Sequence, residues 1–319
     1  MVRTFPVARG LKARGYEVWY YTVPDYEETV AHCADVDRVV LVPFKARRER
    51  DGAIDPVRWP YLAGEFDLTV DLYCPALRHE IETGGAVRRD RIELFCEAAG
   101  LPPETPEFAI TPLEGAWAEG WFDAAGYAPQ RTIALQPFST TVMRDWRLAR
   151  WQELIAALRA RGLNVVAMDG NVGRLDQLEC RRVEGLSVPK MAALLRRTAL
   201  LIAVDSGLLH LAAAVGAACV GLFGSTDGRI ICRHYPRAMP ICAYEFPATA
   251  GAEALRCRPP CYMRLERGFQ LVCGRRGCAV IERITVDRVL EAVGAFAGGN
   301  DQTRNSKLET RKRTSTAAI

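Results

Sequence analysis

The sequence predicts an α/β protein in which parallel strands alternate with helices. The first observation is a segment with two apolar runs, Leu200–Val204 and Cys219–Phe223, separated by a short helical pattern. Strands that are covered on both faces read as continuous apolar runs, so each run is expected to be a buried parallel strand. The second observation is that strand and helix patterns also alternate elsewhere in the chain. The third is length, because 319 residues leave room for two domains of about 150 residues each.

The stretch Ala199–Gly224 is long and apolar enough to raise the alternative of a membrane span. Its strongly polar residues are Asp205, Ser206 and His210. An aspartate inside a spanning helix is costly, the glycines cluster at two points, and helical spacing appears only in the middle. These features favour a buried strand, a tight turn, a helix and a second buried strand.

The first half of the chain contains shorter patterns of the same kind. Strands are expected at Glu17–Thr22, Arg38–Val42 and Asp67–Asp71, and a helix around Val87–Gly100. An irregular linker is expected near Pro112–Gln130, because its glycine, proline and aromatic content follows no regular period.

The end of the first apolar run predicts an anion-binding site. Ligands of open parallel sheets bind at the carboxyl ends of the strands, where Asp205, Ser206 and Gly207 are expected to lie. Either Asp205 or Ser206 is expected to cap a helix that begins near Leu208, and Gly207 allows close backbone approach. The free N–H groups and the dipole of that helix favour an anion such as a diphosphate, which His210 in the first turn could also face.

After the second apolar run, the loop Gly224-Ser225-Thr226-Asp227 offers further backbone N–H groups and hydroxyls to the same crevice. Each of these features alone also fits a capped helix, a core histidine or an ordinary turn. Their combination at one sheet edge favours a phosphate site.

These residues resemble the signature of glycosyltransferase family 9, the heptosyltransferases of lipopolysaccharide core assembly. That family carries D-[ST]-G-x-x-H-[LI]-A-A-A, then a strand and F-G-x-T-[DS]. Ser225 stands where proline is usual. The matching residues are Asp205, Ser206, Gly207, His210, Leu211, Ala212–Ala214, Phe223, Gly224, Thr226 and Asp227.

The resemblance continues over Thr132–Gly162, a strand, a Ser/Thr-rich loop and an amphipathic helix. Arg144 stands where the family commonly has a lysine that contacts the phosphates, and a planar guanidinium replaces the point charge. A surface arginine is the alternative for this position. By contrast, Met168–Gln177 departs from the family's Gly-Gly-x-x-Glu, so the family's ribose-binding acid is not assigned to a residue.

The resemblance implies a GT-B fold, in which two Rossmann-like domains face each other across a cleft. Residues 1–115 would form the acceptor-side domain, 116–130 the linker and 131–298 the donor-binding domain. The polar tail, residues 299–319, is expected to be disordered.

The beginning of the chain departs from the family pattern. Family members open with an apolar strand, a glycine-rich turn that ends in Gly-Asp, and a helix with Thr-x-Pro. Here Thr4, Pro6 and the Leu11-Lys12 region fall inside that helix, so the first strand and the acid presumed to be the catalytic base are expected before Met1. We therefore expect the true start to lie upstream, with a truncated and impaired protein as the alternative.

The function that the resemblance implies is inverting transfer of a sugar, heptose from ADP-heptose, to lipopolysaccharide core or a related glycan. It implies no cofactor and no nucleic-acid partner. It also implies a cytoplasmic protein that can work at the surface of the inner membrane. Two alternatives remain: a non-catalytic nucleotide-sugar-binding protein that lacks the base, and another GT-B enzyme such as a nucleotide-sugar epimerase.

Charge adds one candidate acceptor contact. The formal net charge is +4, of which the tail from Asp301 contributes +3. A basic loop over Phe44–Gly52 carries Lys45, Arg47 and Arg48, which would suit a phosphorylated acceptor. A solvated face is the alternative explanation.

Four of the eleven cysteines are spaced C-x3-C-x11-C-x4-C, namely Cys257, Cys261, Cys273 and Cys278. This spacing is looser than the paired C-x2-C of structural zinc sites, so packed thiols are favoured over a zinc or iron site. The odd number of cysteines and the lack of a recognisable secretory signal argue against a disulfide framework.

Overall fold

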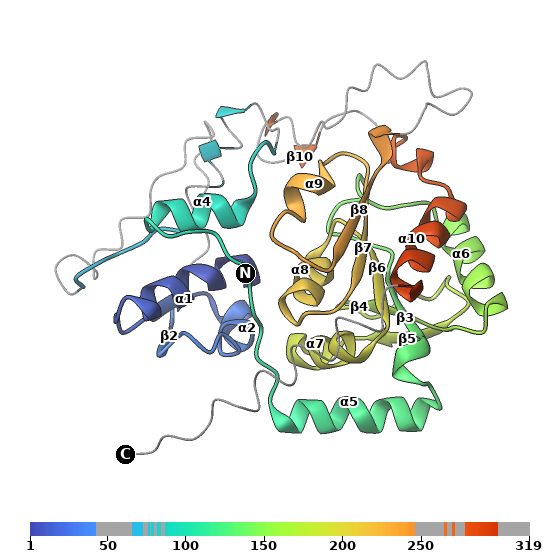
Figure 1. The fold of residues 1–319 in the computed structure, drawn as a ribbon, viewed down its shortest axis with the longest axis horizontal. Coiled ribbons are helices and arrows are strands. Elements are labelled where there is room, and N and C mark those ends of the chain that lie inside the picture. The colour runs from blue at the N-terminus through green and yellow to red at the C-terminus, as the bar shows by residue number, and fades with distance from the viewer. Residues whose placement is uncertain are drawn as a thin grey trace.

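The computed structural model describes residues 1–42, 66–72, 76, 78–79, 82–83, 87–245, 265–266, 270–271 and 278–298. In this part of the chain the elements gather into two halves, an N-terminal half and a larger C-terminal half around a central sheet (Figure 1). The N-terminal half contains α1 (Phe5–Ala13), α2 (Glu27–Val30), β2 (Arg38–Leu41) and α4 (Arg91–Ala98). The predicted α/β class is confirmed. The division into domains at residues 116–130 stays a prediction.

The C-terminal half is built on a parallel sheet, which has six strands in the described part of the chain. In space they follow the order β5-β4-β3-β6-β7-β8. The chain therefore steps outward from β3 to one edge, returns to β6 beside β3 and steps outward to the other edge. This is the strand order of a Rossmann fold, and its topological switch point lies between β3 and β6. The strands are β3 Thr132–Gln136, β4 Asn164–Asp169, β5 Arg181–Glu184, β6 Leu200–Val204, β7 Cys219–Phe223 and β8 Ala238–Cys242.

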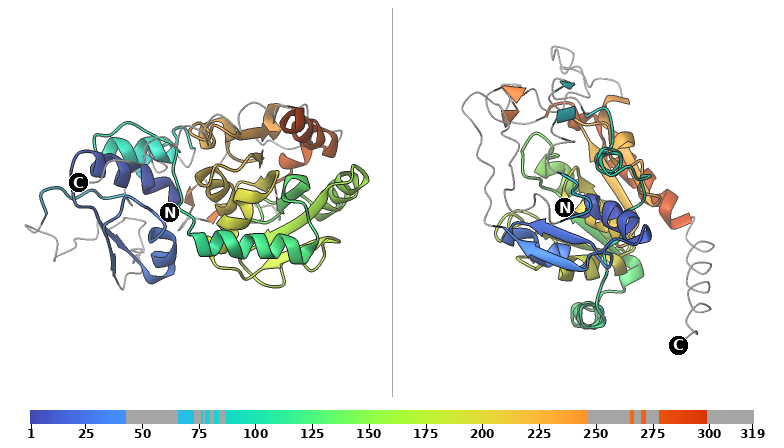
Figure 2. Two further views of the ribbon diagram at one scale, coloured as in Figure 1. Left: turned by 60° about the horizontal axis from the view of Figure 1, so that its bottom comes forward. Right: turned by 90° about the vertical axis from the view of Figure 1, so that its left-hand side faces the viewer.

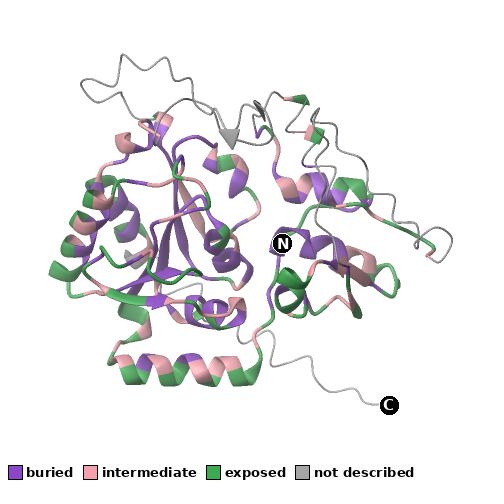
Figure 3. Ribbon diagram, turned by 180° about the vertical axis from the view of Figure 1, so that it is seen from behind, coloured by how far each residue is buried: buried purple, intermediate pink, exposed green. Residues whose placement is uncertain are grey.

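Helices cover both faces of this sheet, as Figure 1 shows. Successive side chains of a strand point to opposite faces, so Ile133 and Leu135 pack in one hydrophobic core while Ala134 packs in the other. The first core includes α6 (Leu148–Ala160) and α10 (Val286–Gly298), and the second includes α7 (Val188–Arg197) and α8 (Gly207–Ala214). The inner strands β3, β4, β6 and β7 are therefore buried along most of their length, whereas the edge strands β5 and β8 are more exposed (Figure 3).

Several sequence predictions for this half are confirmed. The two apolar runs form β6 and β7 with the expected bounds. The amphipathic pattern after Arg144 forms α6, whose Trp151, Leu154 and Leu158 are fully buried. In the described part of the chain, no helix is long and apolar enough to cross a bilayer.

The N-terminal half begins with η1 (Val2–Thr4) and α1 (Phe5–Ala13). Thr4 is the N-cap of α1 and Pro6 lies in its first turn, where a missing backbone N–H is tolerated. Strands β1 (Trp19–Thr22) and β2 (Arg38–Leu41) then pair in parallel, with η2 (Pro24–Tyr26) and α2 (Glu27–Val30) between them.

The third strand expected in this half is not formed, because residues 66–72 contain no strand. A strand needs a partner for its backbone N–H and C=O groups, and the described residues provide no ladder for this run. Leu68 is exposed rather than packed against a core. The prediction for Asp67–Asp71 is therefore wrong for the structure described.

The helix expected around Val87–Gly100 is shorter than predicted, and the expected irregular linker contains a helix. Helix α4 spans Arg91–Ala98, since the carboxylate of Asp90 accepts a hydrogen bond from Ile92 N (2.6 Å) and caps its start. Helix α5 spans Pro112–Ala125 and runs along the outside of the C-terminal half beside α7 (Figures 1 and 2). A capping box between Thr111 and Glu114 begins α5, which explains why a segment rich in glycine and aromatic residues is helical.

The remaining described elements are short. They are η3 Pro129–Arg131, α9 Gly228–Ile231, η4 Ala243–Glu245, β9 Leu265–Glu266, β10 Gln270–Leu271 and η5 Ile281–Arg283, with β9 and β10 antiparallel.

The two halves contact each other directly. Phe108 N donates to the carbonyl oxygen of Ala214 at the end of α8 (2.9 Å), and Thr105 Oγ1 donates to the carbonyl oxygen of His234 (2.9 Å). Glu93 of α4 pairs with Arg233 (2.9 Å) and with His234 (3.2 Å) after α9. These contacts hold the N-terminal half against α8 and α9 of the sheet domain.

Candidate functional site

A cavity of about 280 Å³ opens at the carboxyl edge of the large sheet, at the switch point between β3 and β6. This is where open parallel sheets bind their ligands. Strand ends and the loops after them supply its walls. The lining residues are Gln136, Phe138, Ser139, Thr140, Arg144, Asp169, Gly170, Asn171, Arg174, Ser206, Gly207 and His210.

The N-terminus of α8 forms one wall of this cavity through Ser206 and Gly207. A Cβ at Gly207 would meet no atom within 4 Å, so the glycine leaves the helix start open to a ligand. The backbone N–H groups of a first helical turn have no intrahelical partner, and the helix dipole adds positive potential there. The helix start expected after β6 is therefore present, and its binding of an anion stays a prediction.

The capping expected for this helix is wrong in its detail. Ser206 occupies the N-cap position, but its hydroxyl is bound to Oε1 of Gln136, at the end of β3, and α8 has no side-chain cap. The buried amide oxygen of Gln136 competes for the hydroxyl. The first-turn N–H groups of α8 consequently remain available for a ligand.

Asp205 lies beneath the cavity and positions Arg144 inside it. Its carboxylate is buried and accepts a hydrogen bond from Thr226 Oγ1 at 3.0 Å. Arg144 Nε lies 3.5 Å from the same carboxylate, and Arg144 Nη1 donates to the Asp205 carbonyl oxygen at 3.2 Å. The Arg144 guanidinium is thus held at the cavity by a buried acid, and its predicted contact with a phosphate stays a prediction.

A second arginine faces the same cavity, and sequence reasoning missed it. Arg174 Nη1 lies 3.4 Å from Oδ2 of Asp169, and Nη2 donates to the carbonyl oxygen of Ser139 at 3.0 Å. Its guanidinium also lies over the ring of Phe138, 5.0 Å from the centroid. Asp169 is the last residue of β4 and is 2% exposed. An acidic residue at the carboxyl end of a strand was the sequence feature that could have indicated this part of the site.

His210 lines the cavity from the first turn of α8, as predicted. Its Nδ1 lies 2.8 Å from the hydroxyl of Tyr235. Burial lowers the pKa of His210 well below its ordinary value. The positive charges of Arg3, Arg91 and Arg144 lower it further, so the imidazole is neutral.

Three other predicted site residues do not line the cavity. The Thr226 hydroxyl is turned to Asp205, and the carboxylate of Asp227 caps α9 by accepting from Arg229 N (3.0 Å). Gly224 packs against η5, since a Cβ there would lie 2.7 Å from the Cβ of Ile281. The Gly224–Asp227 loop therefore acts on the site indirectly, because its Thr226 hydroxyl holds Asp205, which in turn holds Arg144.

Other predicted residues lie outside the described part of the chain. These are the acceptor candidates Lys45, Arg47 and Arg48 and the cysteines Cys257, Cys261 and Cys273. The fourth cysteine, Cys278, is described and is half-buried. Among the described residues, no group of three or more His, Cys, Asp or Glu side chains is arranged to hold a metal ion.

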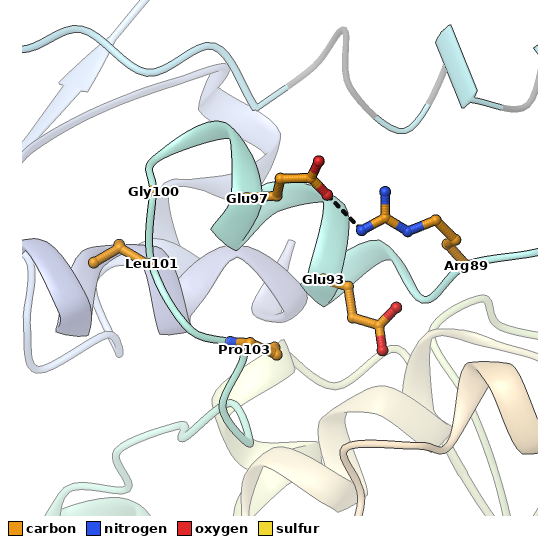
Figure 4. A pocket seen from close by; sticks show the side chains of 6 residues that line it. All are labelled: Arg89, Glu93, Glu97, Gly100, Leu101 and Pro103. Atoms are coloured by element: carbon orange, nitrogen blue, oxygen red, sulfur yellow. Dashed lines mark hydrogen bonds and ion pairs between the residues drawn. The ribbon is translucent and has the colours of Figure 1, made fainter.

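A second hollow, of about 460 Å³, lies beside α4 (Figure 4). Glu93, Glu97 and Arg89 line it, and Arg89 is ion-paired with Glu97. Glu93 is already bound to Arg233 and His234. Its three charged side chains thus already have ion-pair partners, so this hollow lacks the convergent donors of a ligand site that the switch-point cavity has.

Comparison with known proteins agrees with this geometry. The family model described as glycosyltransferase family 9 (heptosyltransferase) matches residues 71–253. A curated relative, lipopolysaccharide heptosyltransferase 3 of Escherichia coli, is 33% identical over 119 residues, 33% of this chain and 34% of that protein. The match thus spans about a third of that relative's length.

Solved structures resemble almost the whole chain. A family 9 glycosyl transferase from Veillonella parvula DSM 2008 has a TM-score of 0.65 at 16% identity, covering 92% of each chain. The E. coli ADP-heptose lps heptosyltransferase II has a TM-score of 0.62 at 17% identity, covering 93% of this chain and 94% of that chain. At these identities the likeness establishes the fold, which is GT-B as predicted. Together with the family match over more than half of its residues, it shows that the chain belongs to glycosyltransferase family 9, the heptosyltransferase family.

Proposed function

We propose that this protein transfers heptose from ADP-heptose to a lipopolysaccharide core or related glycan, with inversion at the anomeric carbon. The observation that carries the proposal is the switch-point cavity, where the N-terminus of α8, Arg144 and Arg174 converge. Membership of family 9 supports the class of reaction. The names of the E. coli relatives support the donor and the acceptor.

The chemistry requires the cavity to stabilise a leaving diphosphate. The acceptor oxygen forms a bond to the anomeric carbon while the bond from that carbon to the diphosphate oxygen breaks, so the electron pair of that bond and negative charge move onto the diphosphate. The acceptor hydroxyl loses its proton to a base. Fixed cations and backbone N–H groups aimed at a leaving group stabilise the charge without reorganising during the reaction.

The two arginines suit this task because buried acids hold them in place. Arg144 is bound to Asp205 and Arg174 to Asp169, and both acids are at least 95% buried. A guanidinium can present two parallel N–H groups to a phosphate. Both arginines line the cavity together with Ser206 and Gly207, so a diphosphate bound at the start of α8 would have two guanidinium groups in the same cavity.

The size of the cavity fits part of a nucleotide sugar and leaves the acceptor to the other half. Drug-sized ligands occupy roughly 300–1,000 Å³, and the cavity holds about 280 Å³. We assign the diphosphate and adjoining groups to this cavity and the acceptor to the face of the N-terminal half. Lys45, Arg47 and Arg48 remain the candidate contacts for an anionic acceptor.

The proposal is tested by incubating the purified protein with ADP-heptose, with and without heptose-deficient lipopolysaccharide. Transfer requires that ADP release depend on the acceptor and that heptose appear on the lipopolysaccharide. Arg144→Ala should lower the rate at least tenfold, because a hydrogen bond to a charged group contributes about 1.5–3 kcal/mol. Arg182→Ala is the control, since Arg182 is a surface arginine paired with Asp176 outside the cavity.

The same assay separates the alternative functions. A nucleotide-sugar-binding scaffold would bind ADP-heptose and release no ADP in either condition. An epimerase would convert ADP-heptose without the acceptor and leave the lipopolysaccharide unchanged. Either result would contradict transfer as the function.

A further inference from the structure

Tyr235 contacts the cavity residue His210 but does not itself line the cavity. It follows α9, is 3% exposed, and places its Oη 2.8 Å from Nδ1 of His210. The two rings meet edge to face, with centroids 5.7 Å apart and an interplanar angle of 63°. Tyr235 is therefore one contact away from any ligand that touches His210.

The direction of this hydrogen bond follows from the protons that each atom carries. A tyrosine hydroxyl has one proton to donate, whereas an imidazole Nδ1 either donates or accepts. In the described part of the chain, Nδ1 of His210 is the hydrogen-bond partner found for Tyr235 Oη. If Nδ1 carried a proton, the buried hydroxyl would have no acceptor and would lose the energy of a hydrogen bond. Tyr235 therefore donates, and Nδ1 of His210 is unprotonated.

The charges around the pair agree with this assignment. Burial raises the pKa of Tyr235 far above its ordinary value, so its hydroxyl keeps its proton. Burial also lowers the pKa of His210, and the positive charges of Arg3, Arg91 and Arg144 act in the same direction. A neutral ring with an unprotonated Nδ1 carries its single proton on Nε2.

We propose that Tyr235 is a positioning residue that fixes His210 as the Nε2–H tautomer, with this N–H donating to the diphosphate of the sugar nucleotide. Nε2 has no hydrogen-bond partner among the described residues, and His210 lines the cavity with Ser206 and Gly207. It would thus add a neutral donor beside the backbone N–H groups of α8. In this tautomer Nε2 cannot take up a proton from the acceptor hydroxyl, so His210 is not the base. The identity of the ligand rests on the proposed function.

The tautomer is tested without any ligand, by long-range ¹H–¹⁵N NMR of the histidine rings. The chain has four histidines, and the signals of His210 are those that His210→Asn removes. We expect an unprotonated Nδ1 and a protonated Nε2 in the wild type, and a mixture of tautomers in Tyr235→Phe. Tyr244→Phe is the control, because it removes another tyrosine hydroxyl hydrogen bond, that with Arg229 (2.7 Å). A protonated Nδ1 in the wild type, or an unchanged tautomer in Tyr235→Phe, would overturn the proposal.

The role of the tautomer is tested by calorimetric titration with ADP and with adenosine. Loss of a group that orients a ligand-binding histidine typically costs about tenfold to a hundredfold in affinity at metal sites, and we expect about tenfold for ADP with Tyr235→Phe. Affinity for adenosine, which lacks the diphosphate, should not change, and Tyr244→Phe should behave as the wild type. Equal ADP affinity in Tyr235→Phe and wild type would overturn the proposed donation. No ADP binding by the wild type would instead count against the proposed function, while the NMR result would still decide the tautomer.

Discussion

At the scale of single residues, the site depends on buried partners that set the state of the side chains facing the ligand. Asp205 holds Arg144, Asp169 holds Arg174 and Tyr235 holds His210. A buried group left without its partner is destabilising, so the partner and the cavity residue form a unit. Substitutions at the buried positions are therefore expected to change ligand binding although they do not touch the ligand.

The depressed pKa of His210 predicts a pH dependence of stability. Below about pH 6.5 the unfolded chain binds a proton on this imidazole that the folded protein does not bind. Stability should consequently fall as the pH drops below this value, by about 1 kcal/mol over one pH unit for this group. Urea unfolding at pH 7.5 and pH 5.5 measures the change.

The control for this prediction is His210→Asn, whose side-chain oxygen can still accept from Tyr235. This variant should lose less stability between the two pH values than the wild type. The interpretation fails if the two proteins lose the same amount.

Sequence reasoning found the residues of the signature and missed the partners that lie far away in the chain. Ser206, Gly207 and His210 follow one another after a strand, so a local pattern reveals them. Arg174 becomes a site residue only because β4 lies beside β3 and brings Asp169 to the same edge. A hydroxyl such as that of Thr226 has several acceptors within reach, and the fold alone decides that it donates to Asp205.

Among the secondary-structure elements, the strands of the parallel sheet could be predicted from the sequence, whereas helix α5 and the segment at residues 66–72 could not. Strands β6 and β7 are covered on both faces, so both are unbroken apolar runs in the sequence and could be recognised there. Helix α5 is stabilised by its capping box and by packing on α7. Its glycine, proline and aromatic residues follow no regular period, so the sequence predicted a linker there instead of a helix. The run at residues 66–72 has strand-forming residues but no neighbouring strand to pair with in the described part of the chain. Composition therefore predicted a strand that the structure does not form.

The loop after β7 gives a prediction at this scale, because Gly224 is where it packs on η5. A Cβ at Gly224 would lie 2.7 Å from Cβ and 3.2 Å from Cα of Ile281. Gly224→Ala should therefore destabilise the protein by about 1–3 kcal/mol, as overpacking does in other cores. It should also weaken ADP binding, because displacing the loop moves Thr226 and with it Asp205.

Gly115→Ala is the matched control, since Gly115 lies inside α5 and a Cβ there meets no atom within 4 Å. That variant should be as stable as the wild type or more stable by up to about 1 kcal/mol, because alanine favours the helix. Urea unfolding compares the three proteins. A Gly224→Ala protein as stable as Gly115→Ala would contradict the packing role.

At the scale of the whole molecule, a GT-B enzyme must bring its acceptor half against its donor half. The described halves meet through Glu93 of α4, which binds Arg233 and His234 next to α9. Burial works to raise the pKa of Glu93, but the hydrogen bonds from Arg233 and His234 outweigh it and lower the pKa. Glu93 thus joins the halves most strongly when it is ionised.

Glu93→Gln should loosen this contact. We expect the radius of gyration from small-angle X-ray scattering to rise at neutral pH, and the unfolding free energy to fall. The difference in stability from the wild type should be present at pH values above the ordinary carboxylate range and disappear as the pH falls through the lowered pKa of Glu93. Glu153→Gln, which removes a pair with Arg150 within α6, should leave the radius unchanged.

Everything proposed for this enzyme depends on the switch-point cavity holding the diphosphate of the donor. A calorimetric titration with ADP, run on the wild type and on folded Arg144→Ala, measures this. We expect saturable binding by the wild type and an affinity at least tenfold lower for Arg144→Ala, from the loss of hydrogen bonds worth about 1.5–3 kcal/mol. No binding by the folded wild type, or equal affinity for the two proteins, would contradict it.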